Sequence, residues 1–383
     1  MTNSVYITRA ASILPNDPIG NDEIEAVLGL VQGRHSRARK IVLANNGIKT
    51  RHYVMDKHGA IHYNNARLTA EAVRRLQDET FSINDISCLC CGTSSPDQLI
   101  PNHAVMVHGE LACPPCEAIS TAGICASSMA ALKYAYMAVG SGCSANAVAT
   151  GSEVVSPSLH ARAYAAPAFN NSETEVRRRP ELGFSKDFLR WMLSDGAGSF
   201  LLQPQPNAHR PSLRIDWIEI ISYANQLETC MYSGAEKGVD GRLIGWREFT
   251  ELNALVEQDL LAPKQDVKLL NDNIVPVTVV QGLTDVLKKH PLKPEEIDFF
   301  LPHFSSEYFR AKLRAGLNEA GLPIADEKWF TNLSRVGNTG AASIYIMLAE
   351  LFNSDRLKRG QRILCFVPES GRFSTSFMLL TVV

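Results

Sequence analysis

The chain has 383 residues and a mass of 42.1 kDa, with 45% hydrophobic residues, 20% charged residues and a formal net charge of -2. This composition is that of an ordinary globular protein and excludes a disordered or collagen-like chain. The near balance of charges argues against a nucleic-acid-binding surface over a whole domain. No apolar stretch approaches the roughly 20 residues of a membrane helix, and no secretory signal pattern is visible, so we expect a cytoplasmic protein that binds neither membrane nor nucleic acid.

Nine cysteines, an odd number, favour free thiols in a reducing compartment. The thiols at 88, 90 and 91 lie in the apolar run ISCLCCG, where small hydrophobic cysteines commonly fill the core. Cys113 and Cys116 have the CxxC spacing of redox or zinc sites, but no second pair follows at a matching distance. We therefore expect a structural role for this pair and no bound metal.

A repeat organises the chain. Residues 69–95 read as a helix, a polar loop and an apolar strand, and a Gly-led helix of small residues (123–132) and a further strand (145–153) follow. The same four elements recur in the same order at 279–306, 337–344 and 362–371. Such a duplication predicts α/β layers with buried, near-continuous apolar strands.

The repeat divides the chain into two similar halves, which we expect over residues 1–205 and 206–383. The small residues of the two Gly-led helices indicate that these helices pack closely at the centre of the molecule. Residues 154–192 form a long polar connection rich in Pro and Arg. A connection of this length is typical of a cap, a lid or an interface element.

Cys125 stands out among the thiols because it lies in a Gly/Ala/Ser-rich turn where a helix follows the strand CEAIST. A helix N-terminus carries partial positive charge and unpaired N–H groups, which favour a thiolate and can hold an oxyanion. Cys125 is therefore a candidate nucleophile. A buried structural cysteine at a tight helix start is the equally weighted alternative.

His303 follows a predicted strand, and Asn338 opens the second small-residue helix. Taken singly, a histidine is more often structural and a Gly-Asn pair more often a turn. The repeat, however, places strand ends and helix starts of both halves at corresponding central positions. We therefore expect Cys125, His303 and Asn338 to converge on one pocket.

Five motifs together carry a family resemblance: GICASSMAAL, LPHFSS, VGNTGAAS, SDGAGSFLL and ATGSE. Together they resemble β-ketoacyl-acyl-carrier-protein synthase III and its relatives in the thiolase superfamily, over nearly the whole chain. The resemblance implies a five-layered αβαβα fold, a two-fold homodimer and no metal or redox cofactor. It also implies that the substrates are thioesters of acyl carrier protein or coenzyme A.

The resemblance assigns roles to these residues. Cys125 takes an acyl group from a thioester, and the oxyanion is held by its own N–H and by the loop containing Ser370 and Gly371. His303 and Asn338 then stabilise the enolate that forms when a malonyl thioester loses CO₂. The carbanion attacks the acyl-cysteine and forms a carbon–carbon bond, and a low thiol pKa is expected to favour this route.

The chain also departs from this family. Its chain-initiating members grip the adenine of coenzyme A with a Trp and an Arg, and the corresponding positions here are Ile41 and Asn45. Their C-terminal glycine-rich loop is replaced by the sequence ESGRF at 369–373, and the 154–192 connection is longer than theirs. These departures point to a specialised relative.

Two further sites are expected, the first from the resemblance and the second from a cluster of basic residues. Ile100, in a loop that crosses the dimer axis in the family, would lie at the end of the partner's acyl tunnel and admit more than a two-carbon primer, unless it is ordinary interface packing. Arg310, Lys312 and Arg314 could dock an acidic carrier protein. Solvated helix faces that balance the acidic residues are the favoured alternative for these cations.

The leading hypothesis is an acyltransferase that condenses acyl thioesters through an acyl-Cys intermediate, in fatty-acid-like, polyketide or other secondary metabolism. One alternative is a related acyltransferase or resorcinol-forming enzyme that works without malonyl decarboxylation. Another is a catalytically idle partner subunit. The intact Cys125, His303 and Asn338 argue against an idle subunit, and Asn338 beside His303 favours decarboxylation.

Overall fold

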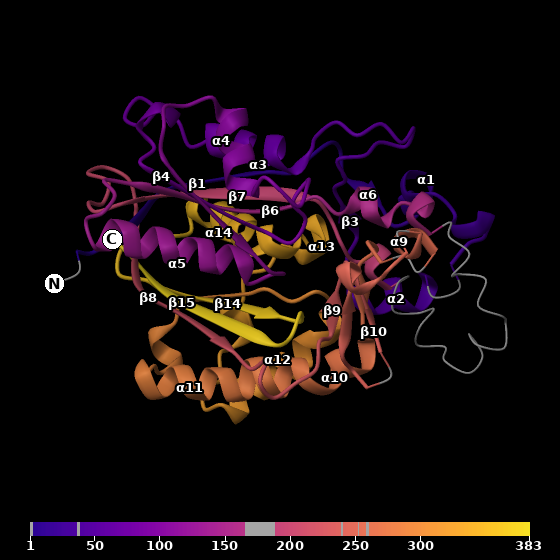
Figure 1. The fold of residues 1–383 in the computed structure, drawn as a ribbon. Helices are drawn as coiled ribbons and strands as arrows, with labels where there is room; N and C mark the ends of the chain where they lie inside the picture. Colours follow the sequence, from indigo (N-terminus) through magenta and orange to yellow (C-terminus); the bar gives the residue numbers. More distant parts are fainter. Residues whose placement is uncertain (1–2, 37–38, 165–187, 239, 252, 258–259) are drawn as a thin grey trace.

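Two β-sheet layers alternate with three helical layers in the computed structural model, which describes residues 3–383 apart from 37–38, 165–187, 239, 252 and 258–259 (Figure 1). Nine of the strands are hydrogen-bonded in one continuous order, β13-β14-β15-β8-β1-β7-β6-β4-β5. The two halves of this order meet only at β1 and β8, where Tyr6 pairs with Arg214 and Ile7 with Leu213. The order therefore folds into two sheet layers, and the expected αβαβα architecture is confirmed.

The first sheet layer contains β1 (Tyr6–Ile13), β4 (Cys88–Thr93), β5 (Glu117–Ala122), β6 (Ala147–Glu153) and β7 (Gly196–Gln203). Strands β4, β5 and β6 are parallel, and β7 is antiparallel to both β6 and β1. The second sheet layer contains β8 (Leu213–Ser222), β13 (Phe299–Pro302), β14 (Arg362–Glu369) and β15 (Ser374–Val382). Here β13 and β14 are parallel, and β15 is antiparallel to its two neighbours.

The helices cover both faces of each sheet layer (Figure 1). The middle layer holds α5 (Ser127–Gly140) and α14 (Ser343–Phe352), the small-residue helices of the repeat. The first sheet is covered outside by α3 (Asn65–Arg74) and α4 (His103–Leu111), and the second by α10 (Val267–Val275), α11 (Gly282–Lys289) and α12 (Arg310–Glu319). The expected domain boundary at 205/206 falls between β7 and β8, and the division into two domains stays a prediction.

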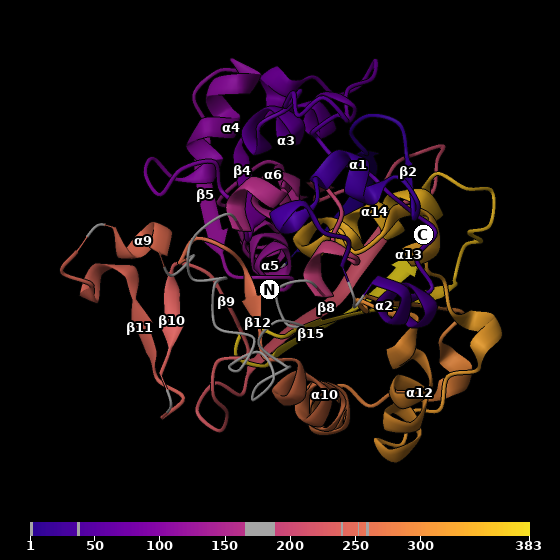
Figure 2. The same cartoon turned by 90° about the vertical axis from the view of Figure 1, so that its right-hand side faces the viewer.

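Shorter elements surround this frame. The remaining helices and strands are α1 (Ile24–Leu28), α2 (Arg39–Asn46), α6 (Ser156–Leu159), α9 (Ala254–Glu257), α13 (Leu333–Val336), β2 (Ile19–Gly20), β3 (Thr50–Arg51), β9 (Met231–Tyr232), β10 (Ala235–Lys237), β11 (Leu243–Gly245) and β12 (Lys264–Gln265). Several of them, from β9 to β12, form an excursion between β8 and α10 that the sequence repeat did not predict. The β10–β11 hairpin and α9 project from the body of the molecule (Figure 2).

Local sequence signals explain where helices begin. Asn64 caps α3 by accepting from the N–H of Arg67, and Asn102 caps α4 by accepting from the N–H of Val105. Such asparagine caps satisfy backbone donors that the helix itself leaves open. The expected connection at 154–192 contains α6, but residues 165–187 lie outside the described part of the chain, so its role as a cap stays a prediction.

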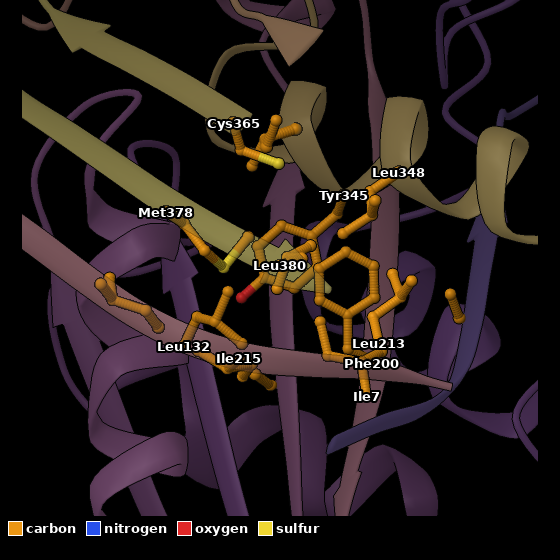
Figure 3. Packing of buried hydrophobic residues seen from close by; sticks show 14 of the residues in the cluster. Ile7, Leu132, Phe200, Leu213, Ile215, Tyr345, Leu348, Cys365, Met378 and Leu380 are labelled. Atoms are coloured by element: carbon orange, nitrogen blue, oxygen red, sulfur yellow. The ribbon is translucent and has the colours of Figure 1, made fainter. Parts of the chain in front are cut away.

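Buried apolar side chains fill the space between the two sheet layers (Figure 3). Phe200 of β7 stacks on Tyr345 of α14, with ring centroids 4.2 Å apart, and the Tyr345 hydroxyl donates to the Ser128 carbonyl of α5 at 3.0 Å. A Cβ on Gly92 would lie 2.5 Å from Ser128 Cα, and one on Gly151 would lie 2.4 Å from the Ala341 oxygen. Glycine is therefore required where the central helices start against the first sheet.

Among the described residues, the helices are all too short or too polar to cross a membrane.

Candidate active site

One pocket brings together the three side chains singled out in the sequence, Cys125, His303 and Asn338. They come from the turn before α5, the end of β13 and the turn before α14. The pocket contains about 830 Å³ of empty space, counting its opening to solvent. The expected convergence of these three residues on one pocket is therefore observed.

Cys125 is buried, with 9% of its surface exposed, in the turn between β5 and α5. The helix begins two residues later, and its N-cap, Ala126, has no side chain that could accept from the first backbone N–H groups. Gly123, at φ 153°, lets the chain turn from the strand into the helix.

The ionisation of Cys125 differs from the sequence-based expectation of a lowered pKa. Burial raises the thiol pKa well above its usual value, and the nearby carboxylates of Glu369 and Glu153 raise it further. The helix N-terminus favours the thiolate, but desolvation and two negative charges oppose it. The prediction of a low pKa was wrong because neither the burial nor the carboxylates could be read from the turn.

His303 lies directly after β13, and its backbone N–H donates to the Phe366 carbonyl at 2.8 Å, which continues the pairing with β14. The residue is 4% exposed, and burial lowers its pKa to about 4. The imidazole is therefore neutral near pH 7. A neutral ring offers one N–H donor and one acceptor.

Asn338 is held on both backbone sides: its N–H donates to the Met192 carbonyl at 3.0 Å, and its carbonyl accepts from the Ser194 N–H at 2.8 Å. Its side-chain Oδ1 accepts from the Gly340 N–H at 3.0 Å. This bond fixes the amide orientation and leaves Nδ2 as a donor. Asn338 therefore presents an amide donor to the pocket that also contains His303.

Two glutamates, which sequence reasoning did not select, lie at this site: Glu153 is buried and Glu369 is half-buried. Glu153 ends β6 and accepts from Ser94 Oγ at 2.7 Å, Ser95 Oγ at 2.5 Å and the Ala341 N–H at 3.1 Å. Glu369 ends β14 and accepts through Oε2 from the N–H groups of Ile124 and Ala126, both at 3.1 Å. Burial raises the pKa of both carboxyl groups, and the hydrogen bonds oppose that rise.

A signal for these glutamates was present in the sequence. The repeated strands ANAVATGSE and RILCFVPESG each end in a glutamate, at 153 and 369. Each carboxylate reaches the start of the central helix that belongs to the other half: Glu153 binds the start of α14, and Glu369 the start of α5. The sequence shows the two glutamates but not their partners, because only tertiary packing brings each glutamate to the helix start of the other half.

An apolar wall completes the pocket. It is lined by α10, by the π-helical segment that follows it (276–281) and by residues near α6, and includes Leu189, Met192, Leu270, Ile274, Val275 and Val279. Besides the three central side chains, the polar lining residues are Ser94, Glu153, Gln265, Thr278, Ser305 and Ser370. A lining that combines an apolar wall with a limited set of polar side chains is typical of pockets for ligands with an aliphatic part.

The C-terminal quarter of the chain, residues 287–379, matches the family model described as 3-oxoacyl-[acyl-carrier-protein] synthase III C terminal. The β-ketoacyl-[acyl-carrier-protein] synthase III of Neisseria gonorrhoeae is 25% identical over 365 residues, covering 94% of this chain and 93% of that protein. The Rickettsia prowazekii enzyme of the same name is 24% identical over 363 residues, with 94% and 93% coverage. The chain is thus similar to β-ketoacyl-acyl-carrier-protein synthase III enzymes over nearly its whole length, and residues 287–379 match the model of their C-terminal part.

Solved structures agree on the fold. The tetronic acid condensing enzyme AbyA1 matches with a TM-score of 0.75 at 21% identity, covering 98% of this chain and 99% of that one. OleA from Xanthomonas campestris matches with a TM-score of 0.73 at 20% identity, with 100% and 99% coverage. The 3-oxoacyl-[acyl-carrier-protein] synthase III of Aquifex aeolicus gives 0.66 at 20% identity, with 99% and 99% coverage.

The departures of this synthase III-like chain are visible in the structure. Ile41 is 62% exposed on α2, and the Asn45 side-chain amide donates to the Ile41 carbonyl of the same helix at 2.7 Å. Ser370 lines the pocket and accepts from Gln265 Nε2 at 3.1 Å, whereas the Gly371 carbonyl accepts from the Cys230 and Met231 N–H groups. The oxyanion role expected for Ser370 and Gly371 stays a prediction.

The expected docking and tunnel residues lie outside the pocket lining. Arg310 binds Glu307 at 2.6 Å and lies over the rings of Phe304 and Trp329, while Lys312 binds the Tyr308 hydroxyl and Arg314 pairs with Asp326. Ile100 is 86% exposed in the single chain. Carrier docking and the role of Ile100 both stay predictions.

Cys113 and Cys116 have one neighbour that the sequence spacing did not reveal. Their sulfur atoms and a ring nitrogen of His108, on α4, lie within 4.8 Å of one another. All nine cysteines are free thiols. None of these three residues lines the pocket described above.

Proposed function

We propose that the protein is a condensing enzyme that loads an acyl group onto Cys125 and extends it by decarboxylative Claisen condensation. The observation that carries the proposal is the convergence of a thiol, a neutral imidazole and an oriented amide on one pocket with an apolar wall. The similarity to synthase III enzymes supports the reaction class. The apolar wall supports an acyl group with an aliphatic chain.

In the first half-reaction, the Cys125 sulfur attacks the carbonyl carbon of an acyl thioester of a carrier protein or coenzyme A. The carbon–sulfur bond to the carrier breaks, and the carrier thiol leaves with the proton that Cys125 gives up. The backbone N–H of Cys125 itself is suited to the transient oxyanion, because it lies just before a helix terminus, whereas the N–H groups of Ile124 and Ala126 are bound by Glu369.

In the second half-reaction, a malonyl thioester loses CO₂, and the electron pair moves onto the thioester as an enolate. His303 and Asn338 Nδ2 donate hydrogen bonds to the enolate oxygen; both are neutral groups already fixed by the fold. The nucleophilic carbon attacks the acyl-Cys carbonyl, the new carbon–carbon bond forms, and the Cys125 thiolate leaves and takes a proton from solvent.

Mass spectrometry of the protein after incubation with a panel of acyl thioesters tests the first step. We expect an acyl adduct on Cys125 alone among the nine thiols, and Cys125→Ala should abolish loading. The exposed thiol variant Cys143→Ala is the matched control and should load normally. Loading of the Cys125→Ala protein, or an adduct elsewhere, would contradict the proposal.

Addition of malonyl thioester to the loaded protein then separates the related functions. Release of CO₂ with a product longer by two carbons supports decarboxylative condensation. Transfer of the acyl group to another acceptor without CO₂ release would instead support the non-decarboxylating or resorcinol-forming acyltransferase.

A homodimer belongs to the same proposal, and Ile100 tests it. Ile100 and Leu99 are 86% and 71% exposed, an apolar pair that a partner subunit would cover. If Ile100 closes the partner's acyl tunnel, Ile100→Trp should shift loading toward short chains, because each CH₂ denied burial costs about 0.8 kcal/mol. Leu99→Trp is the matched control, and an unchanged chain-length profile in Ile100→Trp would refute this role.

A further inference from the structure

Glu369 contacts the turn that holds Cys125, yet the proposed reaction gives it no role. Its Oε2 accepts from the N–H groups of the residues on either side of Cys125, Ile124 and Ala126. The helix that starts there has no side-chain cap of its own. A residue 243 positions away therefore binds the backbone of the turn from which α5 starts.

The local backbone makes room for this carboxylate. A Cβ on Gly123 would lie 3.4 Å from Glu369 Oε2, and one on Gly371 would lie 3.4 Å from Oε1. Glu369 itself is fixed as the last residue of β14, paired with Ser374 of β15. Strands β14 and β15 and the two glycines therefore fix the position of the Glu369 carboxylate beside the turn.

Three titratable groups face Cys125, each from a different strand end. Glu369 at the end of β14 and Glu153 at the end of β6 are acidic, and His303 after β13 is neutral near pH 7. Glu153 has donors on both oxygens. In the described part of the chain, Glu369 accepts through Oε2 alone, so its charge is the less compensated of the two.

We propose that Glu369 is a positioning residue for the nucleophile: its carboxylate clamps the turn around Cys125 from the opposite half of the fold and keeps the thiol protonated at neutral pH. A negative charge beside a thiol disfavours the thiolate. The resting thiol is thereby protected from oxidation and alkylation, which require the thiolate. The inference rests on the proposed role of Cys125 as nucleophile and adds a residue that controls it.

Alkylation of Cys125 by iodoacetamide, followed across pH by mass spectrometry of the peptide that contains it, measures the charge effect. Glu369→Gln keeps an oxygen acceptor but removes the charge, and the alkylation midpoint should fall by about one pH unit or more. At pH 7 the rate should rise about threefold or more for each unit, since a less basic thiolate is also less nucleophilic.

Hydrogen exchange of the Ile124 and Ala126 amides measures the clamp. Glu369→Ala should speed exchange at these amides, and Glu369→Gln should largely preserve their protection. Glu219→Gln, an acid bonded to His290 away from the pocket, is the matched control and should change neither measurement. If Glu369→Ala does not fold, the Gln variant alone still reports the charge effect.

An alkylation midpoint in Glu369→Gln equal to that of the wild type would overturn the proposed control of the thiol. Unchanged exchange in Glu369→Ala would overturn the clamp. Both measurements use no acyl substrate. A protein that shows the shift but never loads an acyl group would therefore leave Glu369 as proposed and refute the condensing function.

Discussion

The starts of the two central helices occupy corresponding places in the repeat, yet they are built for different tasks. The turn before α5 carries a thiol, and Glu369 from the other half accepts two backbone hydrogen bonds from this turn through one oxygen. The turn before α14 carries an amide, and the reciprocal glutamate, Glu153, is satisfied on both oxygens. The same architecture thus gives one turn whose carboxylate is bound through a single oxygen, suited to a controlled nucleophile, and one turn whose carboxylate is bound through both oxygens, suited to hydrogen-bond donation by the amide.

The difference shows how a duplicated fold can divide a two-step reaction. Acyl loading needs a group whose ionisation is controlled, whereas enolate stabilisation needs fixed donors without charge. His303 fits the second requirement, because burial lowers its pKa to about 4. Substitutions in the turn before α5 and in the turn before α14 should therefore impair different half-reactions.

The largest effect is expected from Asn338→Ala. Acyl loading of Cys125 should persist, while malonyl decarboxylation falls by a factor of about 10²–10³, which is the loss of roughly 2.7–4 kcal/mol for one preorganised donor. Asn332→Ala is the matched control, since Asn332 Nδ2 donates to Glu350 outside the pocket lining. Separate assays of loading and of CO₂ release check this, and equal loss of both would point to collapse of the helix start.

A smaller effect is expected from His303 through the pH dependence of stability. The folded-state pKa is about 4 and the unfolded value about 6.5, so the unfolded chain binds more protons between these pH values. The free energy of unfolding should therefore fall as pH drops from about 6.5 towards 4, by about 2 kcal/mol from His303 alone by pH 5.

Urea unfolding at pH 7.5 and pH 5 measures this contribution. His303→Asn should lose about 2 kcal/mol less than the wild type over this interval. His58→Asn, at an exposed position, should behave like the wild type. Equal slopes in the wild type and His303→Asn would mean that the imidazole is not held neutral by the fold.

The smallest expected effect is the difference in stability between variants of the two glutamates. Glu153→Ala leaves the buried Ala341 N–H without a partner, which costs about 1–3 kcal/mol of unfolding free energy. Glu369→Ala should cost less, because water entering the pocket can reach the amides that it releases. Urea midpoints of the two variants, with unchanged slopes, test this order, and a larger loss in Glu369→Ala would reverse the comparison.

The sequence by itself determined the layers and the three central side chains. Strand and helix periodicity, the repeat and the Gly-led turns are local patterns, so α5 and α14 and the strands before them could be placed without a structure. Cys125, His303 and Asn338 lie at strand ends and helix starts, and the repeat brings such positions together. The excursion between β8 and α10 has no counterpart in the first half, and for that reason the repeat gave no sign of it.

Only the tertiary structure decided the ionisation of Cys125 and the partners of the two glutamates. Glu369 meets Ala126 across 243 residues, and Glu153 meets Ala341 across 188, so no local pattern could pair them. Burial and neighbouring charge set a pKa, and both depend on what the other half of the fold places there. The sequence predicted a thiolate from the helix terminus alone, and burial of the thiol, together with the packed carboxylates, reversed that prediction.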